Sequence, residues 1–156
     1  MMIKNMLQLK KIFFVCLYVC STLLITSCKK DKQDTSPVPK ITFISISPAT
    51  ILEYKDSINI TFSYDDYDGD IGANDASVKN LFVTDSRNNV TYEYRISQLS
   101  PSGSTIHIKG NLNTIIKNTA ITNNTTSQTV SYSVYLKDRA GNQSNSISTA
   151  AITITK

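Results

Sequence analysis

Tryptophan is absent from the sequence, and histidine occurs only once, at position 107. A single histidine cannot supply an HExxH zinc site, and the chain contains no GxSxG, no phosphate-binding loop and no Ser-His-Asp set. His107 lies opposite the apolar face of a short alternating segment, so we expect a solvated strand histidine rather than a base or a ligand. These absences favour a protein that is not an enzyme.

Cysteine is also scarce, and all three cysteines lie within the first 28 positions. Three lysines there precede an apolar run over residues 12–25, which is fourteen residues long. Such a run is too short to span a bilayer. A positive segment followed by a short apolar run is typical of a secretory signal peptide.

The segment Ile25-Thr26-Ser27-Cys28 at the end of this run resembles the lipobox of bacterial lipoproteins. The resemblance implies that residues 1–27 are a signal peptide and that Cys28 carries diacylglycerol, usually with an acylated amine. It also implies an address in the cell envelope, at the outer membrane, with the periplasmic or the surface face left open. The alternative is a secretory signal that is cut elsewhere and leaves Cys28 as a plain thiol.

The mature chain then has little net charge and no disulfide. Removing residues 1–27 takes away three of the sixteen basic residues and no acidic one, so 13 basic and 12 acidic residues remain and the net charge falls from +4 to +1. The basicity of the whole sequence therefore gives no reason to expect a nucleic-acid partner. Cys28 is the only cysteine left, which excludes a disulfide framework.

Residues 28–40 are polar, contain two prolines and predict a flexible tether behind the lipidated cysteine. From residue 41 to residue 156 the pattern changes to an alternation of apolar and polar side chains, which predicts one β-domain. Alternation is strict over residues 57–64 and 129–136. Weaker strands are expected over residues 41–47, 78–85, 90–96, 105–109 and 147–154, and the first and last of these slip by one residue, as a bulge would cause.

The strict alternation also selects a core. We expect the buried side chains to include Ile58, Ile60, Phe62, Val130, Tyr132, Val134 and Leu136. Residues 112–117 could form one helical turn, and the polar residues 118–128 predict a loop.

Seven strands in this length predict an all-β, immunoglobulin-like or fibronectin III-like antiparallel sandwich. Without tryptophan or a cysteine pair it is not an antibody-type domain. The segment from Tyr132 to Asn145, in which an alternating strand runs into Asp-Arg-Ala-Gly-Asn, resembles the last hairpin of bacterial Ig-like modules. The segment Asp68-Gly-Asp-Ile-Gly72 is similar to lipoproteins of Bacteroidota with this fold. Both resemblances imply architecture rather than activity.

Five of the twelve acidic residues lie between positions 65 and 75, with no lysine or arginine among them. Immunoglobulin strand order places the loop after the second strand beside the end of the sixth, and so brings Asp138 to this cluster. Carboxylates that crowd in this way suit Ca²⁺, which takes six to eight oxygen ligands. We therefore expect a calcium site from Asp65, Asp66, Asp68, Asp70 and Asp138, and we assign Asp85 to the opposite end.

Asp66-x-Asp68-x-Asp70 has the one-three-five spacing of a metal loop but is not an EF-hand, since glycine occupies the fourth and seventh positions and no glutamate stands at the twelfth. The alternative is a solvated acidic turn in which the glycines serve only the backbone.

Two functional classes remain open for such a domain. The first is a non-enzymatic, lipid-anchored structural or adhesion module. The second is an accessory lipoprotein that captures a glycan or protein ligand, suggested by eight tyrosines, of which Tyr92 and Tyr94 share a strand face. Two carboxylates could in principle hydrolyse a glycoside, but such enzymes place them across a cleft on a larger scaffold.

Overall fold

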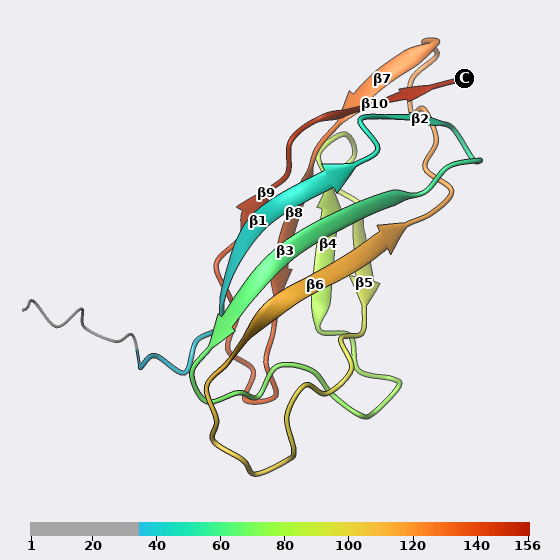
Figure 1. Cartoon of the computed structure of the whole chain (residues 1–156). Helices are drawn as coiled ribbons and strands as arrows, with labels where there is room; N and C mark the ends of the chain where they lie inside the picture. The colour runs from blue at the N-terminus through green and yellow to red at the C-terminus, as the bar shows by residue number, and fades with distance from the viewer. Residues whose placement is uncertain (1–34) are drawn as a thin grey trace, which may run out of the picture. The chain divides into compact units, whose positions relative to one another are not determined.

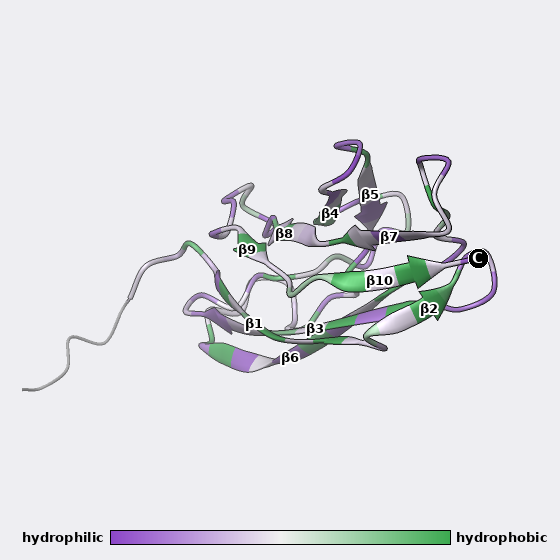
Figure 2. Cartoon of the chain, turned by 90° about the horizontal axis from the view of Figure 1, so that it is seen from above, coloured by the Kyte–Doolittle hydropathy of each residue, from purple (hydrophilic) through white to green (hydrophobic). Residues whose placement is uncertain are grey.

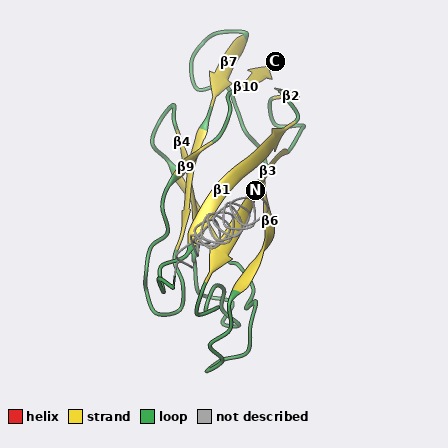
Figure 3. Cartoon of the chain, turned by 60° about the vertical axis from the view of Figure 1, so that its left-hand side comes forward, coloured by secondary structure: helices red, strands yellow, loops and turns green. Residues whose placement is uncertain are grey.

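The structure is a computed structural model that describes residues 35–156. The predicted signal peptide, Cys28 and most of the predicted tether lie outside the described residues. The described chain contains strands and loops and no helix (Figure 3). The prediction of an all-β domain is therefore confirmed.

Ten strands make up the described chain, most of them short. They are β1 (Lys40–Ser47), β2 (Thr50–Leu52), β3 (Ile58–Asp66), β4 (Leu81–Asp85), β5 (Thr91–Tyr94), β6 (Ile108–Ile116), β7 (Ser127–Val130), β8 (Tyr132–Leu136), β9 (Ile147–Ser148) and β10 (Ile152–Thr155). The expected count of about seven is not confirmed, because two of the expected strands are each divided in two and β2 was not expected.

The strands form three sheets, with the orders β1-β3-β6, β5-β4-β8-β9 and β2-β10-β7 (Figure 1). Figure 2 shows the sheets β1-β3-β6 and β5-β4-β8-β9 as separate layers, with the sheet β2-β10-β7 near the C-terminus of the chain. All pairings are antiparallel except that of β10 with β2. The predicted slip in the first strand is confirmed as a register shift between Phe43 and Ser45.

The core lies between the layers and is built by every second residue of the central strands. In β3, Ile58, Ile60 and Phe62 are fully buried, and β8 contributes its own alternate residues in the same way. All seven core positions expected from the sequence are buried. Alternation thus identified both central strands because each has one face against the opposite sheet.

The largest error concerns β6. The sequence predicts a strand over residues 105–109 and a helical turn over residues 112–117, whereas the structure has one strand from Ile108 to Ile116. Its full length pairs with β3, from Ile58 opposite Ile116 to Asp66 opposite Ile108. Pairing with a long central strand therefore overrides the weak local pattern.

Replacing Phe62 by alanine should lower the free energy of unfolding by about 3 to 5 kcal/mol, because the ring is fully buried and its loss leaves a cavity. Chemical denaturation of the two proteins measures this difference. Ile115→Ala is the control: this side chain is 51% exposed on the edge strand β6, and its loss should change stability by no more than about 0.5 kcal/mol. Equal effects of the two substitutions would contradict the assignment of the core.

Candidate metal centre

Three aspartates converge at the end of β3. Asp66 is the last residue of that strand, and Asp68 and Asp70 follow in the loop. One carboxylate oxygen from each of the three lies within 4.8 Å of the other two. We call this group the aspartate triad, and the end of the domain that holds it the acidic end.

Strand periodicity explains why Asp66 points inward. The buried positions of β3 are Ile58, Ile60 and Phe62, and two further steps of two along the strand reach Asp66, which is 0% exposed. Its Oδ2 accepts a hydrogen bond from the backbone N–H of Ile71 at 3.1 Å. Its Oδ1 is buried and has no hydrogen-bond partner in the protein. A buried carboxylate oxygen without a partner is costly, so this atom calls for a proton or a cation.

The other two members of the triad share this feature. Oδ1 of Asp68 and Oδ1 of Asp70 are also buried and without a hydrogen-bond partner. Among the described residues only two further buried side-chain atoms lack a partner, the hydroxyl oxygens of Thr119 and Tyr132. The unsatisfied buried carboxylate oxygens of this part of the chain are therefore gathered at one point.

The loop that carries the triad is held tightly to its neighbours. A side chain at Gly69 or Gly72 would collide with the backbone carbonyl of Ile106 or Ser97, and both glycines have positive φ, at 73° and 86°. These close approaches require glycine. Ser100 Oγ also donates a hydrogen bond to the Gly69 carbonyl. The alternative of a solvated acidic turn gave these glycines a purely conformational role, and the structure adds their close contacts with the segment before β6.

The hairpin after β8 holds the loop from another direction. The backbone N–H of Arg139 donates to the Asp70 carbonyl at 3.1 Å, and that of Ala140 donates to Asp70 Oδ2 at 2.9 Å. The guanidinium of Arg139 donates to the Gly72 carbonyl at 3.1 Å. Three segments that are distant in sequence therefore meet at the triad.

Asp138 lies beside the triad but is not a member of it. Its two carboxylate oxygens accept hydrogen bonds from the backbone and side-chain nitrogens of Asn142, at 2.7 and 2.9 Å. Burial raises the pKa of Asp70, and the charge of Asp138 raises it further. Asp138 therefore contributes charge to the site, while its oxygens cap its own turn.

Asp65 is not brought into the triad. It neighbours Asp66 on a strand, so its side chain lies on the opposite face, where it is partly exposed. It forms an ion pair with Lys109 at 2.8 Å and a hydrogen bond with His107 at 2.6 Å, and the hydrogen bond from Lys109, followed by that from His107, lowers its pKa. His107 itself precedes β6 and is not in a strand, contrary to the sequence prediction.

Asp75 is likewise outside the triad, because its carboxylate accepts hydrogen bonds from the backbone and hydroxyl of Ser77.

Beside the triad lies an open hollow of about 370 Å³. Its lining consists of Asp68, Asp70, Gly103, Ser104, Thr105, Arg139 and Ala140. The triad is thus closed on the side of Asp66 and reachable from solvent on the side of Asp68 and Asp70.

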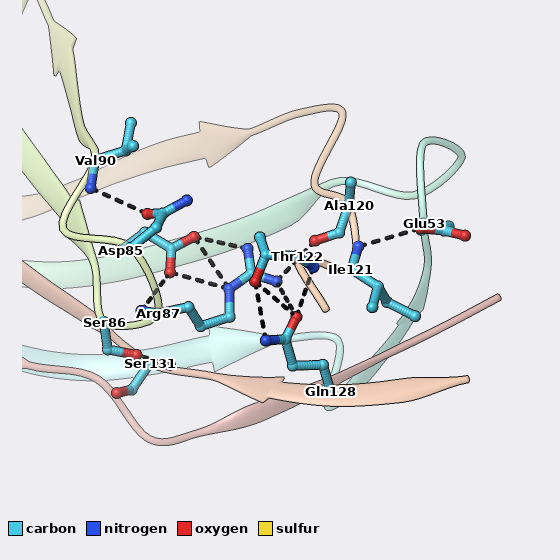
Figure 4. A network of polar contacts seen from close by, with 11 residues as sticks. Glu53, Asp85, Ser86, Arg87, Val90, Ala120, Ile121, Thr122, Gln128 and Ser131 are labelled. Atoms are coloured by element: carbon cyan, nitrogen blue, oxygen red, sulfur yellow. Dashed lines mark hydrogen bonds and ion pairs between the residues drawn. The ribbon is translucent and has the colours of Figure 1, made fainter. Parts of the chain in front are cut away.

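Asp85 ends β4 at the opposite end of the domain, as expected (Figure 1). It is fully buried and bonds to the guanidinium of Arg87 at 2.7 Å (Figure 4). Arg87 also donates to the Ala120 carbonyl at 2.7 Å and to Gln128 Oε1 at 3.1 Å. The sequence analysis missed this network, although an aspartate at an inward position of a strand was a usable signal.

The donor set of the triad consists only of carboxylate oxygens. Such a set suits a hard cation, whereas zinc and the later transition metals favour histidine and cysteine ligands.

No protein-family model, curated protein or solved structure matches the chain. Within residues 35–156 there is no helix of the length and apolarity needed to cross a membrane.

In the presence of a chelator that removes divalent ions, the free energy of unfolding should fall as the pH rises from about 4 to about 7. Burial and the neighbouring Asp68 raise the pKa of Asp66 from 3.8 to about 7. Between these pH values the carboxyl of Asp66 keeps its proton in the folded state and has lost it in the unfolded state. Raising the pH therefore favours the unfolded state and lowers the free energy of unfolding. Urea denaturation across this range measures the slope. In Asp66→Asn the slope should be flatter, and an unchanged slope would contradict the assignment.

Replacing Asp85 by alanine should lower the free energy of unfolding by about 3 to 5 kcal/mol, because it leaves the buried charge of Arg87 unpaired. Adding Arg87→Met should restore part of this loss, since the unpaired charge is then gone. A double-mutant cycle by denaturation tests both statements. Additive effects of the two substitutions would show that the ion pair is not coupled.

Proposed function

We propose that the protein is a lipid-anchored component of the cell envelope that acts as a non-enzymatic structural or adhesion module. The observation that carries this proposal is Cys28, which follows a lipobox-like sequence and precedes a polar segment and an all-β domain. In this proposal the lipid on Cys28 holds the domain at the outer membrane, and the segment after it acts as a spacer.

We further propose that the domain has an immunoglobulin-like or fibronectin III-like topology. Two strand orders support this assignment. The order β1-β3-β6 corresponds to strands A, B and E, and β4-β8-β9 corresponds to strands C, F and G. Strand β5 follows β4 in the chain and pairs with it. It therefore extends the C-F-G sheet instead of the A-B-E sheet. That pairing is closer to the fibronectin III-like alternative.

The absence of catalysis is part of the proposal and rests on the state of the candidate groups. His107 pairs with Asp65 on the surface and contacts the ring of Tyr67, with ring centroids 5.5 Å apart. Its hydrogen-bond partner among the described contacts is a carboxylate, and no serine, cysteine or threonine nucleophile is hydrogen-bonded to it there.

A second function, capture of a glycan or protein ligand, is favoured by the hollow beside the aspartate triad. Its lining offers the hydroxyls of Ser104 and Thr105 next to the charges of Asp68 and Arg139, a polar surface suited to hydroxyl-bearing ligands. Tyr92 and Tyr94, which suggested an aromatic platform, lie instead on the half-buried face of β5 and pack against the core. Binding to a glycan array would separate this function from a structural one.

Replacing Cys28 by serine should abolish lipid attachment and release the protein from the membrane fraction, because the thiol that carries the lipid is gone. Metabolic labelling with a radioactive fatty acid, mass spectrometry and fractionation measure the change. Two or three acyl chains are needed for stable anchoring, so the effect on fractionation should be large.

Cys20→Ser is the matched control, since Cys20 lies in the predicted signal peptide. Its labelling and fractionation should be those of the unchanged protein. Equal mass, labelling and fractionation of Cys28→Ser and the unchanged protein would overturn the proposed anchor.

A further inference from the structure

Two aspartates in this domain are completely buried at the last position of a strand, and their surroundings differ in one respect. Asp85 at the end of β4 has a cation within the chain, the guanidinium of Arg87. Asp66 at the end of β3 forms no ion pair among the described residues, and the carboxylates of Asp68 and Asp70 lie beside its own. The same buried charge is therefore compensated at one end of the domain and uncompensated at the other.

Arg139 does not serve as the missing cation for Asp66. Its guanidinium donates to the carbonyls of Ile71 and Gly72 and to the hydroxyl of Ser100. Its charge lowers the pKa of Asp70 but is not among the influences on Asp66. Burying an ionised carboxylate without a partner costs several kcal/mol, and two more carboxylates beside it add repulsion.

We propose that Asp66, Asp68 and Asp70 bind one Ca²⁺, which fixes the loop after β3, against which the other two segments of the acidic end pack. The unpartnered Oδ1 atoms of the three residues are its protein ligands. One carboxylate oxygen of each residue lies within 4.8 Å of such an oxygen of the other two, and the coordination sphere of Ca²⁺ has a diameter of about 4.6 to 5.2 Å, so one ion can contact all three residues.

Charge and access support the same ion. The two positive charges of Ca²⁺ and the one of Arg139 balance the three negative charges of the triad. The negative charge of Asp138, which lies outside the ligand set, adds attraction for the cation. The triad is too few ligands for the six to eight oxygens that Ca²⁺ takes, so water must fill the remaining positions from the side of the hollow. Mg²⁺ is disfavoured because it demands a near-ideal octahedron and gives up its own water reluctantly.

The ion would have a defined structural effect. It would fix the loop after β3, to which the hairpin after β8 is hydrogen-bonded through Asp70. That hairpin also holds the beginning of the described chain, since Asn145 exchanges hydrogen bonds with the backbone of Ile41 at 2.9 Å. The segment 97–106 is joined through its contacts with Gly69 and Gly72. The ion would thus stiffen the end of the domain at which β1 begins.

Calcium titration of the full-length protein, purified in detergent and freed of divalent ions, tests the proposal. Calorimetry should show one Ca²⁺ per chain with a dissociation constant of about 0.1 to 1 mM, the range of extracellular modules, and weaker binding of Mg²⁺. Saturating Ca²⁺ should raise the melting temperature by a few degrees relative to chelator.

Matched variants identify the ligands. Asp68→Asn should weaken Ca²⁺ binding at least tenfold and abolish the thermal shift, and Asp70→Asn should do the same if Asp68→Asn fails to fold. Asp65→Asn is the control, since it removes the same charge from the same end but from the opposite face of β3, and it should keep the binding and the shift. Superimposed melting curves in Ca²⁺ and chelator, or equal loss in Asp65→Asn and Asp68→Asn, would overturn the proposal. Both readouts are independent of Cys28 and of the proposed anchor.

Discussion

The two-residue period of β3 is the constraint on which most of this domain depends. β3 lies between β1 and β6, and its inward positions supply the centre of the core. The strand does not stop where its apolar residues stop, and the next inward position after Tyr64 is Asp66. The geometry that buries Phe62 therefore also buries a carboxylate, because a strand cannot turn one residue outward without changing the face of all the others.

The two ends of the domain differ in how they stabilise a carboxylate that is buried at an inward strand position. At the end of β4 the chain supplies an arginine two residues after the buried aspartate, and the bidentate pair is joined to Gln128 and the Ala120 carbonyl. At the end of β3 it supplies two more aspartates at the same spacing of two. Adding negative charge to a buried negative charge is a poor way to stabilise a turn, and it is the usual way to build a site for a hard cation.

Much of this could be predicted from the sequence, for reasons that are local. Strands β3 and β8 have one face against the opposite sheet, so their alternation is strict and their core residues were predicted correctly. The spacing of Asp66, Asp68 and Asp70 is also local, and it indicated the triad. Asp65 was grouped with the triad because the predicted strand ended at Tyr64. Had the alternation been continued for two residues, Asp65 and Asp66 would have been placed on opposite faces.

The parts that could not be predicted depend on distant partners. Strand β2 is three residues long and pairs in parallel with β10, about a hundred positions away, so its own short segment carries no signal. β6 contains Gly110, which lies against the ring of Tyr64 with no room for a side chain, and this interrupts the apolar pattern that would have identified the strand. Pairing with β3 supplies what the local sequence lacks.

The position of the triad determines which part of the domain the proposed cation would stiffen. The acidic end is also the end where the described chain enters β1, close to the hairpin that carries Asp138 and Asn142. An ion bound there would stiffen the end of the domain at which β1 begins, whereas an ion at the opposite end would not. Calcium is present outside the cytoplasm at concentrations comparable to the dissociation constants of extracellular calcium modules. The stiffness of this end would then depend on the compartment in which the domain is displayed, since the same chain without the ion keeps three unpartnered carboxylate oxygens in its interior.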